Sequence, residues 1–169
     1  SALALMHLER EGLVSADIFT DGAIKNAMVV HAAFGGSTNL ILHLPAVAHA
    51  AGLKQPTVKD WQYYNQKVPR LVDSLPNGPR GYATVQVFLA GGVPETMLHL
   101  RKMGLLDLDA MTVTGLPLGE NLQCWEKAER RKRLKEKLYK LDGIDPGDVI
   151  SDPETAALKG FSSTVTFPT

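Results

Sequence analysis

Two glycines followed by three small polar residues form the segment of this sequence with the clearest chemical potential: Gly35, Gly36, Ser37, Thr38 and Asn39. Ser37 is a candidate N-cap for the apolar stretch that follows, because its hydroxyl can accept a hydrogen bond from a backbone amide two or three residues later. Glycines also let another group approach the main chain closely. Free amides and the positive end of a helix dipole would then face one place, which suits a carboxylate or a phosphate. The segment is therefore either a substrate-binding site for an anion or a packing joint at the start of a helix.

The other residues that could do chemistry do not form a known motif. The five histidines, at positions 7, 31, 43, 49 and 99, show no ligand spacing such as HExxH. The single cysteine, Cys124, excludes an internal disulfide and an iron–sulfur centre bound only by cysteines of this chain. We expect Cys124 to be a half-buried small hydrophobe rather than a nucleophile. The sequence thus assigns no catalytic residue and no metal ligand.

The composition limits the partners of the chain. Its 169 residues include 18 lysines plus arginines and 18 aspartates plus glutamates, so the net charge is zero. Nothing in this balance favours nucleic acid or an anionic membrane surface. No apolar stretch approaches the roughly 20 residues of a membrane helix. Together with the single cysteine, this indicates a cytoplasmic protein with no membrane partner.

Helix signals surround the glycine segment. A helix is expected from about 23 to 34, ending at the glycine pair, and a second in the apolar run that follows Asn39 within the stretch 33–52. The second is apolar nearly all round, so it should be buried, and Pro45 should interrupt its hydrogen bonds. Thr57 should cap a helix that carries Trp61, and Gly91-Gly92 should begin another helix.

Later segments suggest strands and a long helix. Ala110 to Thr114 is the best strand candidate, and Arg70 to Leu75 is a weaker one. A basic helix is predicted from about Leu118 to Lys140, with a solvated face. Its acid-before-base pairs at i,i+4 are Glu126–Arg130, Glu129–Arg133 and Glu136–Lys140. The fold class predicted is α/β: a helix-rich segment with a few short parallel strands.

Ordered blocks of the sequence carry a resemblance to a known family. They are KNAMVVHAAFGGSTNLILHLPAVAHAAGL, KVPRL, AGGVPETMLHLRKMGLL, MTVTG and LGENL. The sequence resembles the dihydroxy-acid/6-phosphogluconate dehydratase family, which also includes the aldonate dehydratases. The variants SLPNGP, FLAGGVPE and TGLPLGENLQCWEKAERR look most like its bacterial D-xylonate (aldonate) dehydratase branch.

The resemblance implies a hydro-lyase that converts a sugar acid such as D-xylonate to its 2-keto-3-deoxy acid. In the family, that reaction uses two metal groups: an iron–sulfur cluster, which three cysteines hold, and a magnesium ion. Both are needed because hydroxide is a poor leaving group and the C2 proton is weakly acidic. The cluster motifs, of CDK and GSC type, do not occur here. The iron–sulfur cluster and Mg are therefore expected in the full-length enzyme, with none bound by this segment, which should be inactive alone.

The resemblance also implies a place for the chain. Residues 1–150 match the later half of an N-terminal dehydratase domain, and 151–169 would be a linker toward a C-terminal β domain. Residues 35–39 would then bind a small-molecule sugar acid, and the full-length protein would be a homo-oligomer. Two alternatives come from other classes: a non-catalytic phosphate- or nucleotide-binding or scaffold module that uses the same loop, and an interaction domain that presents the basic helix.

Overall fold

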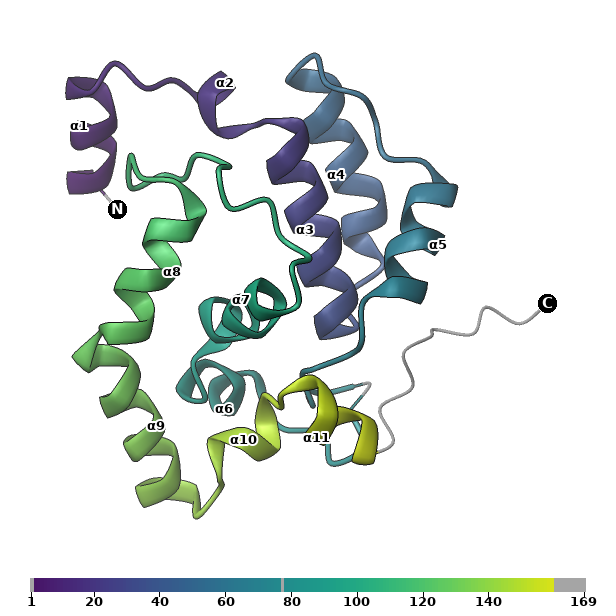
Figure 1. Cartoon of the computed structure of the whole chain (residues 1–169), viewed down its shortest axis with the longest axis vertical. Coiled ribbons are helices and arrows are strands. Elements are labelled where there is room, and N and C mark those ends of the chain that lie inside the picture. Colours follow the sequence, from purple (N-terminus) through teal and green to yellow (C-terminus); the bar gives the residue numbers. More distant parts are fainter. Residues whose placement is uncertain (1, 77, 160–169) are drawn as a thin grey trace.

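A computed structural model describes residues 2–76 and 78–159 of the chain. Within these ranges the chain folds into eleven helices joined by turns. Their bounds are α1 (Ala2–Arg10), α2 (Ser15–Ile18), α3 (Asp21–Phe34), α4 (Asn39–Ala50), α5 (Val58–Lys67), α6 (Thr84–Leu89), α7 (Gly92–Lys102), α8 (Leu118–Lys127), α9 (Glu129–Asp142), α10 (Pro146–Val149) and α11 (Pro153–Leu158). Figure 1 shows α8 and α9 along one edge, α3, α4 and α5 along the other, and α6 and α7 between them.

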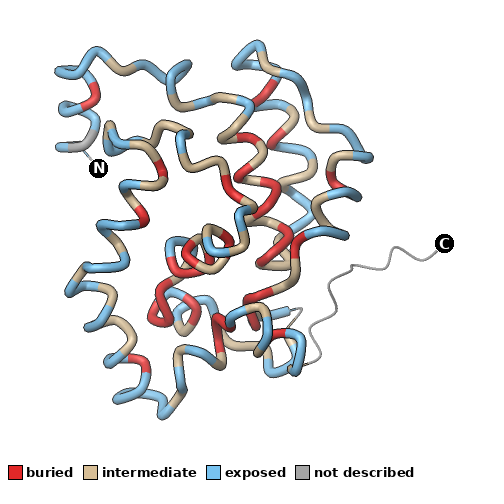
Figure 2. Tube along the Cα trace, in the orientation of Figure 1, coloured by how far each residue is buried: buried red, intermediate tan, exposed pale blue. Residues whose placement is uncertain are grey.

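The main core forms where α3 and α7 meet. Buried Val29 and Ala33 of α3 pack with Leu98 and Leu100 of α7 and with Leu122 of α8. Figure 2 shows the buried residues concentrated in these inner helices, while the outer faces are exposed. Burying large aliphatic side chains stabilises a fold by about 1.5–3 kcal/mol each. The core therefore fixes α3, whose C-terminal end leads into the glycine segment.

The helix after the glycine segment is less buried than its sequence predicts. Leu44 and Ala48 of α4 pack against α3, but Leu42 is 73% exposed and Val47 is also exposed. The expectation of a buried helix was wrong, because α4 lies at the edge of the molecule and the described residues cover one of its faces (Figure 1). The helix continues through Pro45 to Ala50, and Pro45, which has no N–H, donates no hydrogen bond within it.

The predicted strands are not confirmed. In the described residues, pairing outside helices is limited to two isolated antiparallel bridges, Val72 with Ile150 and Met111 with Pro117. The segment from 110 to 114 turns back at once, since Gly115 has a φ of +76° and Thr112 donates its hydroxyl to the Leu116 carbonyl. The chain is helix-rich, and no sheet is present in its described part to support the α/β class.

The predicted long helix is two helices. It breaks at Ala128, whose ψ of 128° is extended, into α8 and α9. None of the three predicted i,i+4 ion pairs is found among the described residues. Arg131 and Lys135 of α9 instead bind Glu95 of α7, and Arg101 of α7 binds Glu126. The basic residues therefore hold α9 against the core rather than pairing along its surface.

Residues 71–73 connect the end of α3 to the residues around α10 through backbone hydrogen bonds, and we call this segment the backbone tie. The amides of Leu71 and Val72 both donate to the carbonyl of Ala33, at 2.8 and 3.2 Å. The Asp73 amide donates to the Val149 carbonyl, and the Ser151 amide donates to the Leu71 carbonyl, each at 2.9 Å. The segment 71–73 is thus fixed between the end of α3 and the residues around α10.

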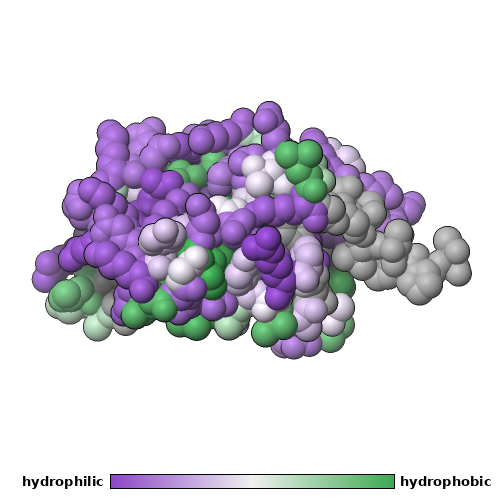
Figure 3. Space-filling model, turned by 90° about the horizontal axis from the view of Figure 1, so that it is seen from below, coloured by the Kyte–Doolittle hydropathy of each residue, from purple (hydrophilic) through white to green (hydrophobic). Residues whose placement is uncertain are grey.

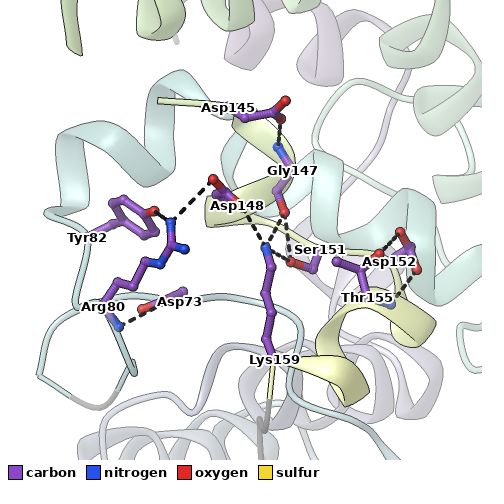
Figure 4. A network of polar contacts seen from close by, with 10 residues as sticks. All are labelled: Asp73, Arg80, Tyr82, Asp145, Gly147, Asp148, Ser151, Asp152, Thr155 and Lys159. Carbon is purple, nitrogen blue, oxygen red and sulfur yellow. Dashed lines mark hydrogen bonds and ion pairs between the residues drawn. The ribbon is translucent and has the colours of Figure 1, made fainter. Parts of the chain in front are cut away.

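Side chains reinforce this tie (Figure 4). Asp148 lies between two cations, with its carboxylate oxygens 3.4 Å from Arg80 Nη1 and 3.0 Å from Lys159 Nζ. Lys159 also donates to the Gly147 carbonyl and to the Ser151 hydroxyl. Nearby, buried Asp73 accepts hydrogen bonds from the Arg80 and Gly81 amides, which fixes the turn before α6.

The predicted linker, 151–169, is described only up to 159. This part contains α11, whose Ala156 is buried in the main core. Residues 160–169 lie outside the described residues, and the boundary at 150 stays a prediction. Seen from below, the surface is mostly hydrophilic, with separate apolar patches (Figure 3). No helix in the described ranges is long and apolar enough to cross a membrane.

Candidate functional site

The glycine segment connects α3 to α4. Gly35 ends α3 in the left-handed conformation, with φ 60° and ψ 48°, which an L side chain adopts only with strain. Its amide donates to the Ala32 carbonyl, and the Gly36 amide donates to the His31 carbonyl. This pattern satisfies the last carbonyls of α3 and turns the chain sharply toward α4.

Two side chains lie directly against the glycines. A Cβ at Gly35 would stand 2.9 Å from Cζ of Arg70, and a Cβ at Gly36 would stand 2.5 Å from Cδ2 of His31. Both positions therefore need glycine, because a larger residue would collide with the side chain of Arg70 or His31. The sequence suggested such a close approach of another group to the main chain. Neither neighbour was predicted, because Arg70 is distant in sequence and the ring direction of His31 depends on the turn.

The hydrogen bond predicted for the Ser37 hydroxyl is present, but the N-cap of α4 is Thr38, not Ser37, and Thr38 makes no side-chain cap bond. The Ser37 hydroxyl accepts a hydrogen bond from the Asn39 amide at 3.3 Å, two residues later. The Ser37 carbonyl accepts from the Leu40 amide at 3.1 Å and from His31 Nε2 at 2.9 Å. The side chains of Ser37, Thr38 and Asn39 are exposed. The backbone N–H groups of Ser37 and Thr38 donate a hydrogen bond to no described residue. These two amides and three polar side chains remain available to a ligand.

Arg70 adds positive charge beside this segment. Its Nε donates to the Val72 carbonyl at 3.3 Å, which holds the side chain along the tie described above. Burial lowers the pKa of Arg70, while the charge of Asp73 opposes that shift. An arginine stays protonated in proteins. The neighbourhood is therefore suited to an anion, with hydrogen-bond donors from the main chain and a cation nearby.

The described residues do not fit an iron–sulfur cluster or a metal ion. Among them, no group of three or more histidines, cysteines, aspartates or glutamates could hold a metal. Cys124 is the sole cysteine of the chain and is exposed, not half-buried as expected. The arrangement at residues 35–39 can bind and orient an anion, but it contains no carboxylate or thiol for acid–base or nucleophilic chemistry.

A separate cavity of about 460 Å³ lies between α7, α8 and the turn at 112–114. Its walls are mainly apolar, with Met97 and Trp125, and Cys124 also lines it. Thr112, Thr114 and Asn121 form a hydrogen-bonded group at this cavity, with Asn121 Nδ2 2.7 Å from both threonine hydroxyls. Sequence reasoning missed this group, although its residues lie in the blocks MTVTG and LGENL. None of residues 35–39 lines the cavity.

Comparison with known proteins gives the family. Residues 1–121 match the model of the dihydroxy-acid/6-phosphogluconate dehydratase N-terminal family. Over all 169 residues the chain is 60% identical to D-xylonate dehydratase YagF of Escherichia coli K12, and it is 56% identical over 168 residues to D-xylonate dehydratase YjhG of the same organism. It is 44% identical over 120 residues to the dihydroxy-acid dehydratase of Cytophaga hutchinsonii.

These matches extend over most of this chain but over a small share of the relatives. The chain covers 26% of each of the two D-xylonate dehydratases and 21% of the Cytophaga hutchinsonii protein. The alignments with the first two relatives include the glycine segment, the turn before α6 and the basic helix α9. By sequence, therefore, the chain belongs to the dihydroxy-acid/6-phosphogluconate dehydratase family.

Proposed function

We propose that this chain is the part of a sugar-acid dehydratase that binds the carboxylate end of the substrate, and that the complete protein removes water from D-xylonate to give its 2-keto-3-deoxy acid. The observation that carries the proposal is the exposed segment Ser37–Asn39, in which two backbone N–H groups donate a hydrogen bond to no described residue. The D-xylonate dehydratases that match the whole chain support the choice of substrate.

In this proposal the Ser37 and Thr38 amides donate to the substrate carboxylate, and the α4 dipole and Arg70 stabilise its charge. The side chains of Thr38 and Asn39 bind substrate hydroxyls. Such contacts orient the sugar acid and fix which carbon faces the reacting groups. They do not break a bond, so the segment acts in binding and orientation.

The iron–sulfur cluster and the magnesium ion of the family would be bound by residues elsewhere in the complete protein. When bound, such metals help a hydroxide to leave and make the C2 proton more acidic. The donor set of the described residues does not fit them, and no step of the reaction is assigned to this chain through them. We also propose a cytoplasmic, homo-oligomeric complete enzyme.

The family membership favours this proposal over a non-catalytic phosphate-binding or scaffold module. The test is to prepare the protein anaerobically at the full length of its relatives and to measure formation of 2-keto-3-deoxy acid from D-xylonate. A branched 2,3-dihydroxy acid serves as the comparison substrate. We expect turnover of D-xylonate to exceed that of the branched acid. No turnover of any sugar acid by cluster-loaded protein would refute the proposal.

A further inference from the structure

His31 turns back from the last helical turn of α3 to hold the glycine segment. Its Nε2 lies 2.9 Å from the Ser37 carbonyl oxygen, and its ring fills the space that a Cβ at Gly36 would need. A carbonyl oxygen only accepts hydrogen bonds, so Nε2 must carry the proton. His31 therefore donates to the peptide that joins Ser37 to Thr38.

The surroundings of the ring favour this one orientation. His31 packs edge-on against Trp61, with ring centroids 5.1 Å apart and planes at 72°, and Trp61 is 4% exposed. The other ring nitrogen, Nδ1, is buried without a hydrogen-bond partner among the described residues. A proton on Nδ1 would be an unsatisfied buried donor, which costs free energy. The tautomer with its proton on Nε2 fits these surroundings.

The hydrogen bond has a consequence for the next amide. A peptide unit is planar and trans, so its C=O and N–H point in opposite directions. When His31 and the Leu40 amide bind the Ser37 carbonyl, the N–H of Thr38 must point away from them. It is one of the two amides, with that of Ser37, that donate to no described residue. The hydrogen bonds to the Ser37 carbonyl thus fix the direction of the Thr38 N–H, which is a proposed donor to the anion.

We propose that His31 is a positioning residue: through the Ser37 carbonyl it aims the Thr38 N–H at the carboxylate of the substrate. This inference rests on the proposed function for the substrate, but the fixing of the segment by His31 can be measured without turnover. The bond forms before the reaction and persists through it. His31 therefore contributes equally to the ground state and the transition state, which affects KM more than kcat.

The test uses the full-length protein with three variants. His31→Leu removes the donor and keeps an apolar side chain of moderate size, whereas His31→Gln keeps an N–H donor. His7→Leu is the matched control, because His7 is an exposed histidine of α1 whose ion pair with Glu11 is long, at 3.9 Å. We expect His31→Leu to raise KM for D-xylonate at least tenfold with kcat within about threefold, and His31→Gln to stay within about threefold of the wild type in both.

Hydrogen exchange separates this inference from the proposed function. Amides of residues 36–41 should exchange faster in His31→Leu than in the wild type and in His7→Leu, whether or not the protein turns over D-xylonate. If the wild type is inactive, the proposed function fails while this measurement still decides the role of His31 in the segment. If His31→Leu does not fold, His31→Asn replaces it, since its side chain is too short to reach the carbonyl. Unchanged exchange and KM, or equal loss in the leucine and glutamine variants, would overturn the inference.

Discussion

Glu95 of α7 and Arg131 of α9 meet through a two-pronged ion pair. Nε of Arg131 lies 2.7 Å from Oε2 of Glu95, and Nη2 lies 2.8 Å from Oε1. Lys135 Nζ adds a third contact at 2.8 Å, and the Glu95 side chain is only 5% exposed. A buried carboxylate is tolerated here because charged donors satisfy both of its oxygens.

Replacing Glu95 by glutamine should destabilise the fold. The variant keeps the shape of the side chain but leaves Arg131 and Lys135 without a counter-charge in a partly buried place. We expect a loss of about 2 kcal/mol in the free energy of unfolding. Urea denaturation followed by tryptophan fluorescence measures this loss. Glu126→Gln is the control, since the Arg101–Glu126 pair is more exposed and should matter much less. Equal losses in the two variants would contradict the prediction.

Stability should also fall in acid because of Glu95. Burial alone would raise the pKa of Glu95, but hydrogen bonds and charges from Arg131 and Lys135 lower it from 4.5 to about 2. A lowered pKa in the folded state means that the stabilisation is complete above pH 4.5 and is lost as the pH falls from 4.5 through 2. The expected loss is about 3 kcal/mol. Denaturation curves at several pH values check this, and Glu95→Gln should show a flatter dependence over the same range.

Substitutions of the polar residues in the glycine segment should have different effects on kinetics and on stability. Thr38→Val and Asn39→Ala should each lower kcat/KM for D-xylonate more than tenfold in the full-length enzyme, with a normal melting temperature. That factor corresponds to about 1.4 kcal/mol of lost transition-state stabilisation. Ser37→Ala should instead lower stability by about 0.5–2 kcal/mol and leave the kinetics nearly unchanged, because its hydroxyl accepts a hydrogen bond from the Asn39 amide at the start of α4. Wild-type kinetics in the Thr38 and Asn39 variants would reduce the segment to a packing role.

The close approach of Arg70 can be tested with a pair of glycines. Gly35 and Gly52 have φ values of +60° and +68°, but a Cβ would meet Arg70 only at Gly35 and would find open space at Gly52. Both alanine variants should lose about 1–2 kcal/mol from the left-handed conformation. Gly35→Ala should lose more, because Arg70 must move. Thermal denaturation of the two variants gives the difference, and identical losses would show that Arg70 moves aside without cost.

Local signals allowed much of the helical framework to be predicted. The ends of α3 and the capping of α5 by Thr57 follow from residues within one turn. The same holds for the hydrogen bond between the Ser37 hydroxyl and the Asn39 amide, although the N-cap of α4 is Thr38. Such signals depend on backbone groups of near neighbours, so a single sequence contains them.

Features that depend on distant partners could not be predicted. No glycine or proline marks the break at Ala128, which places Arg131 and Lys135 beside Glu95. The apolar pattern of α4 predicts burial, but which of its faces is covered depends on the tertiary packing. At the candidate site, His31 and Arg70 were not predicted as neighbours of the glycines. Their contacts follow from the turn and from the tie at 71–73.

The backbone tie at 71–73 also has a consequence for the order of folding. Its contacts with 149–151 join residues far apart in the sequence, and closing a long loop costs more entropy than forming a helix turn. We therefore expect the helices to form early and this pairing to form late. During synthesis, residues 149–151 leave the ribosome long after the glycine segment. The glycine segment follows Ala33, whose carbonyl accepts from Leu71 and Val72, so it would reach its final surroundings only when residues 149–151 have docked.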